Sequence, residues 1–207
     1  MLDRPPAFFI ADSLGLDFLN SIATPYDVEI DWLDGGSGLV AWLAQADLAP
    51  AHALKALTER AAPGKLDEAA AQARALREWF RGFVRAHMGR PLASEALREL
   101  GPLNALLKDD EAFRQIAARQ DGEGGPFEIK TARLWRTPQS LLAPIAEALA
   151  RCVCDEDFAS IRACEGHRCT LIFADRTGKR RRRWCRMAMC GNRAKQAAHR
   201  HRLKAGR

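Results

Sequence analysis

Two pairs of cysteines near the end of the chain constrain what it can fold into. The first pair is Cys164 and Cys169, in CEGHRC, and the second is Cys185 and Cys190, in CRMAMC. Four residues separate the members of each pair, and fifteen separate the two pairs. Cysteine pairs at matched spacing are typical of tetrahedral zinc sites, in which each pair lies on a tight turn. The sequence therefore predicts one structural Zn2+ held by these four thiolates.

Several alternatives to this site remain open. An iron–sulfur cluster has the same ligands, and zinc is favoured because nothing else in the sequence suggests redox chemistry. A histidine could replace one sulfur, and the nearby candidates are His167, His199 and His201. The cysteines could also be unrelated buried thiols or form two disulfides. Cys152 and Cys154 are left outside the site, because Cys152 continues the apolar stripe of a predicted helix.

The cysteine pairs define a C-terminal module over residues 160–207. Such a short module has few large apolar side chains, so metal binding would supply much of its folding free energy. LIFAD (171–175) is rich in β-forming residues, and we expect it to pair with RRRW (181–184) as a hairpin across the turn Asp175–Gly178. Gly191 follows the last cysteine, and Asn192 can cap a final helix. This module is predicted to be a small, treble-clef-like ββα zinc finger.

Residues 1–155 are predicted to form a mostly helical domain. Apolar residues recur at helical spacing in several segments, with the longest predicted helix at Leu66–Met88, where arginines are expected on the face opposite the apolar stripe. The other predicted helices are Leu14–Ile22, Leu39–Leu43, the segment from Ala51, and Thr137–Cys152. Residues 113–119 and 127–135 flank the glycine-rich DGEGGP and are predicted to form a β-hairpin. The predicted fold class is therefore α+β.

The charge of the chain is distributed unevenly. Residues 1–150 contain 16 Lys and Arg against 21 Asp and Glu, whereas residues 151–207 contain 16 against 5, and 13 basic residues follow Asp175 without an acid. A basic end on a mildly acidic body indicates an anionic partner, with DNA first and RNA or an acidic protein surface as alternatives. The alternative is that the basic C-terminal segment is a solvated tail that binds no partner. No apolar run is long enough to span a membrane, and we expect a cytoplasmic protein.

Basic residues around the second cysteine pair, together with Asn192, are the candidate nucleic-acid contacts. They are Arg180, Arg181, Arg182, Arg183, Asn192, Arg193, Lys195, Arg200 and Arg202. Because one short finger offers a limited interface, a homodimer formed through the helical domain is a reasonable expectation. Trp184, beside Cys185, is expected to shield the sulfurs.

The helical domain offers one candidate ligand site and no candidate catalytic residue. Asp17 and Asn20 are polar residues in an apolar helix and could line the pocket of a small-molecule sensor. The simpler interpretation is that Asp17 faces solvent and that Asn20 caps the helix or bonds locally. No nucleophile motif, phosphate-binding loop or HExxH sequence is present, so we do not expect an enzyme.

Two stretches resemble a known family. The run RRRWCRMAMCGNRAK (181–195), together with the preceding cysteine pair and LIFAD, is similar to the CGNR zinc finger of bacterial proteins, and CGNR stands letter for letter at Cys190–Arg193. LGLDFLNSI (14–22) and WLDGGSGLVAWLAQADL (32–48) resemble the ABATE domain, which precedes this finger in a family described as stress-induced transcription regulators. The resemblance implies a zinc-dependent DNA-binding module with its ligands at the four cysteines.

Overall fold

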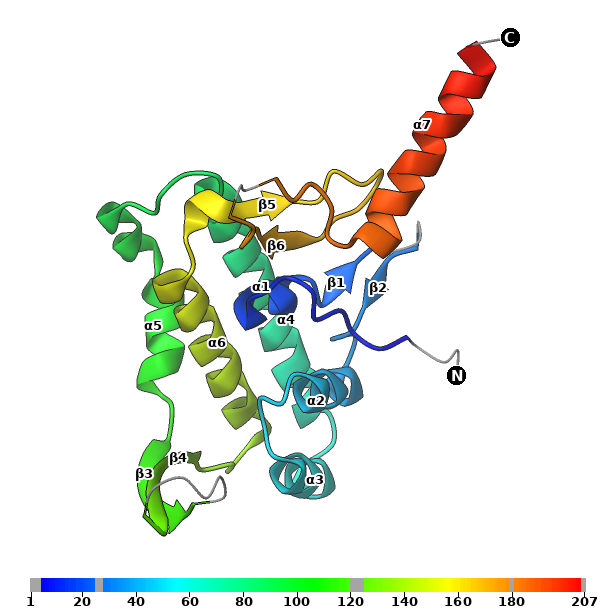
Figure 1. Ribbon diagram of the computed structural model, residues 1–207. Helices are drawn as coiled ribbons and strands as arrows, with labels where there is room; N and C mark the ends of the chain where they lie inside the picture. Colours follow the sequence, from blue (N-terminus) through cyan, green and yellow to red (C-terminus); the bar gives the residue numbers. More distant parts are fainter. Residues whose placement is uncertain (1–4, 25–27, 120–124, 179–180, 206–207) are drawn as a thin grey trace.

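A bundle of helices forms the larger part of the molecule (Figure 1). The computed structural model describes residues 5–24, 28–119, 125–178 and 181–205. At its centre α1, α4 and α6 contact one another, α2 packs on α4, α3 on α2, and α5 on α6. The bounds of these helices are Leu14–Leu19 (α1), Gly36–Gln45 (α2), Ala51–Arg60 (α3), Lys65–His87 (α4), Gly101–Lys108 (α5) and Leu142–Asp155 (α6). Short 3₁₀ helices lie at Ser94–Glu99 (η1), Pro138–Leu141 (η2) and Phe158–Ser160 (η3).

The long helix α4 confirms the predicted apolar stripe but not the predicted placement of its arginines. Ala73, Phe80 and Val84 are fully buried, as the helical spacing requires. Arg77 and Arg81 are also buried, with 2% and 8% exposure. Arg77 forms a two-pronged ion pair with Asp31, at 2.8 and 2.9 Å. The prediction that these arginines face away from the core is therefore wrong, because a guanidinium can be buried when carboxylate and carbonyl oxygens satisfy it.

Two small antiparallel sheets belong to this part of the chain. The predicted hairpin is confirmed as β3 (Ala112–Ala118) and β4 (Phe127–Arg133), in a register that places Ile116 opposite Ile129. It extends from the bundle at the end farthest from α7 (Figure 1). The predicted helix at Leu14–Ile22 ends earlier, at Leu19, because Ile22 and Ala23 form strand β1 and pair with β2 (Ile30–Asp31).

The C-terminal module contains a different hairpin from the predicted one. Strand β6 (Ile172–Ala174) pairs with β5 (Ile161–Ala163), which precedes the first cysteine, and residues 181–184 form no strand. A one-turn π-helix, η4 (Met187–Gly191), leads into helix α7 (Asn192–Ala205). Asn192 already has helical backbone angles, φ −68° and ψ −39°, so the prediction that it caps α7 is wrong. The ββα composition itself is confirmed.

The module and the bundle share one hydrophobic core. The buried side chains of Phe158, Ile172 and Phe173 belong to the same cluster as those of α1 and α4. The main chains are joined as well, since Ala174 N–H donates to Ala11 O at 2.9 Å and Gly89 N–H donates to Phe158 O at 2.8 Å. Helix α6 ends at Asp155 and β5 begins at Ile161, and the boundary that the sequence predicts between them stays a prediction. Among the described residues, no helix has the length and apolar character needed to cross a membrane.

Candidate metal centre and basic surface

The four cysteines of the two pairs converge on one point. The sulfurs of Cys164, Cys169, Cys185 and Cys190 all lie within 4.8 Å of one another. The Cys169 and Cys185 sulfurs are 3.9 Å apart, and those of Cys185 and Cys190 are 3.6 Å apart. A tetrahedral zinc site with Zn–S bonds of about 2.3 Å has sulfur–sulfur edges of about 3.8 Å. The cluster therefore fits one structural zinc ion, and the four predicted ligands are those that converge on it.

Local geometry around the first cysteine pair explains how the chain forms the site. The main-chain N–H groups of Gly166 and Cys185 donate to the Cys164 sulfur, at 3.4 and 3.2 Å. A side chain at Gly166 would place its Cβ 2.6 Å from the Cys190 sulfur, so the turn must pass close to the second pair without a side chain. Such N–H donors stabilise a thiolate, which is the form that binds a metal.

The other candidate ligands lie outside the cluster. His167, His199 and His201 are exposed, and none belongs to the group of converging ligand atoms. Cys152 is buried beside Gly15, and burial raises the pKa of its thiol to about 12, which makes it a core residue. Cys154 is exposed. Among the described residues, the converging ligand atoms are therefore all sulfurs, which is the composition of a structural zinc site.

Arg182 is a structural clamp. Its guanidinium donates to Ile10 O at 2.8 Å, to the Asp12 carboxylate and to Cys185 O, and it lies 4.1 Å from the centre of the Phe173 ring. It thereby ties the segment before α1 to the main chain at a metal ligand. These bonds engage its donors, so Arg182 is a poor candidate for the nucleic-acid contact predicted from the sequence.

Two more of the predicted contact residues are engaged within the finger. Arg183 pairs with Glu165 at 2.6 Å and lies 4.9 Å above the Trp184 ring. Arg193 is half-buried and donates to the Cys190 sulfur at 3.4 Å. This second contact places a positive charge beside a metal ligand.

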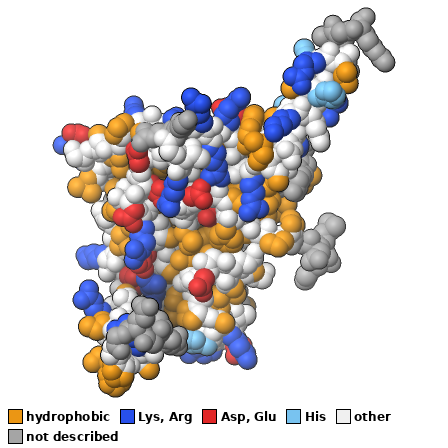
Figure 2. All heavy atoms as spheres, viewed as in Figure 1, with side chains coloured by type: hydrophobic (Ala, Val, Ile, Leu, Met, Phe, Trp, Pro, Cys, Tyr) orange, Lys and Arg blue, Asp and Glu red, His pale blue; other side chains and the backbone are white. Residues whose placement is uncertain are grey.

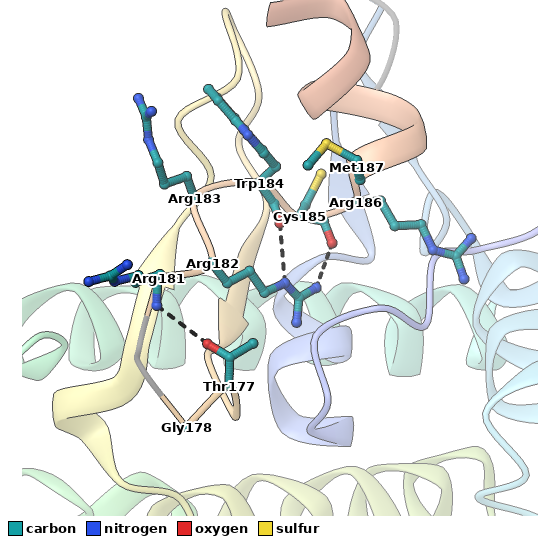
Figure 3. Close-up of a pocket in the computed structure, with 9 residues that line it drawn as sticks. All are labelled: Thr177, Gly178, Arg181, Arg182, Arg183, Trp184, Cys185, Arg186 and Met187. Carbon is teal, nitrogen blue, oxygen red and sulfur yellow. Dashed lines mark hydrogen bonds between the residues drawn. The ribbon is translucent and has the colours of Figure 1, made fainter. Parts of the chain in front are cut away.

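The remaining predicted contact residues are exposed. Arg181, Asn192, Lys195, Arg200 and Arg202 all lie on the surface, whereas Arg180 lies outside the described residues. Arg186 is exposed too and was not among the predicted contacts, although its position directly after Cys185 could have suggested it. Thr177, Gly178 and residues 181–187 line a groove of about 900 Å³, which brings Arg181 and Arg186 to one surface (Figure 3).

Helix α7 projects away from the rest of the molecule (Figure 1). Every side chain from Lys195 to Leu203 is exposed, whereas Arg193 and Ala194 in the first turn are half-buried. Ala197, Ala198 and His201 therefore do not pack on the metal core. Alanine buries too little apolar area to hold such a helix down. Lysine, arginine and histidine side chains line the projecting part (Figure 2).

Asp17 and Asn20 bond to the main chain. Asp17 is buried, and its Oδ1 accepts from Ile10 N–H at 2.8 Å and Ala11 N–H at 2.9 Å. Burial raises the pKa of its carboxyl to about 6. The Asn20 amide donates to Ile172 O at 2.8 Å and accepts from Ile172 N–H at 3.0 Å. The simpler interpretation is wrong for Asp17, which is not on the solvent face. Asn20 is the C-cap of α1, as that interpretation allows, and its side chain also bonds to strand β6. A ligand-binding role stays a prediction.

Comparison with known families agrees with this architecture. Residues 12–156 match the ABATE family, described as "Putative stress-induced transcription regulator", and residues 160–203 match the CGNR zinc finger. A search of curated proteins found no match. The two matched regions coincide with the helical bundle and with the module that contains the sulfur cluster. The chain therefore belongs to the ABATE family and carries a C-terminal CGNR zinc finger.

Proposed function

We propose that this chain regulates transcription by binding DNA through its zinc finger, in a response to stress as the description of its family suggests. One observation carries the proposal. The sulfur cluster holds a surface on which Arg181 and Arg186 are exposed and form no ion pair with the described residues. Guanidinium groups that are not already in ion pairs can contact DNA phosphates and release their counterions, which makes binding more favourable.

Helix α7 favours duplex DNA over the alternatives. Lys195, Arg200 and Arg202 lie on the part of this helix, from Lys195 to Leu203, in which every side chain is exposed. The major groove of B-form DNA admits an α-helix, whereas the major groove of A-form RNA is too deep and narrow for side chains to read. An acidic protein surface would satisfy the charge but would not need a projecting helix.

We further propose that the protein is cytoplasmic and that its role is binding and not catalysis. None of the six cysteines forms a disulfide, and a four-thiolate zinc site is suited to a reducing compartment, so we place the protein in the cytoplasm. We assign the chain a binding role only, because the converging thiolates form a closed structural site.

We further propose a homodimer formed through the β3–β4 hairpin of the helical domain. Ile116, Phe127 and Ile129 lie on one face of this hairpin and are 76%, 66% and 72% exposed. Apolar side chains also gather at this end of the molecule in Figure 2. In a twofold-symmetric dimer, the identical hairpin of a second chain can cover this apolar face. Both strands are also edges of a two-stranded sheet, which can pair with another chain.

A salt titration tests the DNA-binding proposal. Affinity of the zinc-loaded chain for a duplex should fall linearly with salt on logarithmic axes, with a slope of about −0.9 per phosphate contacted. Arg200→Ala and Arg202→Ala should each reduce that slope by about 1. Arg98→Ala is the control, because Arg98 is exposed on η1 in the bundle. Absence of binding at low salt, or an affinity that does not depend on salt, would overturn the proposal.

A further inference from the structure

The groove beside the sulfur cluster combines apolar and cationic side chains. Arg181 and Arg186 extend on opposite sides of it, and Trp184 and Met187 project between them (Figure 3). Met187 is 53% exposed, and Trp184 is half-buried. A surface that needed only to contact phosphates would not expose a methionine and an indole beside two arginines. The arrangement instead suits a ligand with an apolar ring and negative charges on either side.

The two apolar side chains are held in position by their neighbours. A Cβ at Gly191 would lie 2.2 Å from the Met187 sulfur and 3.1 Å from Trp184 Cδ1, so both side chains pack over the bare glycine. Arg183 lies over the indole at 4.9 Å and is itself held by Glu165. Arg182 also fixes the main chain at Trp184 and Cys185, since it donates to the carbonyl oxygen of each. A site that is already ordered loses little conformational entropy when it binds a ligand.

The chemistry of the groove matches one nucleotide whose base is not paired. In a regular duplex the faces of the bases are stacked on each other and cannot reach an indole. An unpaired base exposes a flat apolar face, and stacking on an aromatic side chain is favourable for every base. Arginines on both sides can then contact the flanking phosphates, and Arg181 and Arg186 form no ion pair within the described part of the chain.

We propose that the groove of residues 181–187 binds an unpaired DNA nucleotide, with its base on Trp184 and Met187 and its neighbouring phosphates at Arg181 and Arg186. The proposal rests on the DNA-binding function proposed above and specifies which form of DNA the finger prefers. It differs from the expectation that Trp184 serves only to shield the sulfurs, since the ring lies at the surface of the groove (Figure 3).

The test compares three DNA probes of equal length with the full zinc-loaded chain. The probes are a duplex, the same duplex with a short unpaired bubble, and the single strand, and binding is measured by fluorescence anisotropy at fixed salt. We expect the bubble to bind about tenfold tighter than the duplex. Trp184→Ala and Met187→Ala should remove this preference and leave duplex affinity within about twofold, whereas Trp184→Phe should keep most of it. Arg200→Ala, on α7, should weaken all three probes alike.

The outcomes separate this proposal from the one on which it rests. If no probe binds, the DNA-binding function fails. If all probes bind equally, or if Trp184→Ala weakens the duplex as much as the bubble, the groove proposal alone is overturned. A polyglutamate peptide is added as a competitor of the DNA probes. If it displaces DNA from the parent chain but not from Trp184→Ala, the groove binds an acidic protein instead. Each variant must retain one zinc per chain, and if Trp184→Ala does not fold, Met187→Ala and Trp184→Phe decide the matter.

Discussion

Asp17 is a buried acid whose protonation is coupled to the stability of the fold. Burial raises the pKa of its carboxyl from 3.8 to about 6, while the N–H groups of Ile10 and Ala11 oppose this rise. Because the folded-state pKa is the higher one, the folded state holds the proton more tightly than the unfolded chain does. The resulting stability is fully present below pH 3.8 and is lost as the pH rises through 6.

Asp17→Asn should remove this pH dependence. The amide Oδ1 can still accept from Ile10 and Ala11, but it carries no charge that burial would destabilise. We expect the variant to match the parent chain near pH 4 and to exceed it by about 3 kcal/mol in free energy of unfolding at pH 8. Denaturant unfolding of both chains between pH 4 and 8 measures the difference. Equal pH slopes for the two chains would contradict the assignment.

At the scale of elements, the sequence predicts those structures whose partners are adjacent in the chain. The β3–β4 hairpin is predicted correctly because its two strands flank one glycine-rich stretch. The partner of LIFAD is predicted wrongly because Ile161–Ala163 is too short to show an alternating pattern. The burial of Arg77 could not be predicted, since it depends on Asp31, which lies 46 residues away in the sequence.

The hairpin also provides the element-scale prediction. Ile116→Glu introduces a charge on the exposed apolar face opposite Ile129, so it should convert a dimer into a monomer. Leu97→Glu is the matched control, because Leu97 is 66% exposed on η1 and lies outside the hairpin. Light scattering coupled to size-exclusion chromatography gives the mass of each chain in solution. A monomeric parent chain, or a dimer that survives Ile116→Glu, would overturn the proposed dimer contact.

At the scale of the whole molecule, the metal site could be predicted and its attachment to the bundle could not. Each cysteine pair is a local pattern, so its spacing alone indicates the ligands. The partners of Arg182 are Asp12 and Ile10, which lie 170 and 172 residues away in the sequence. Asn20 reaches Ile172 over 152 residues. These contacts follow from the packing of the finger on the bundle, which no short segment of sequence encodes.

Because of these contacts, zinc removal should destabilise the bundle as well as the finger. Asn20 and Ala11 bond to strand β6, whose module has little apolar area of its own, so α1 and β6 should unfold together. We expect a chelator to lower the melting temperature of the single unfolding transition by about 10 °C or more, and to accelerate hydrogen exchange in α1. Cys154→Ser, at an exposed cysteine outside the cluster, should keep its zinc and the parental melting temperature. If chelation instead left α1 protected and the main transition unchanged, the finger and the bundle would be energetically independent.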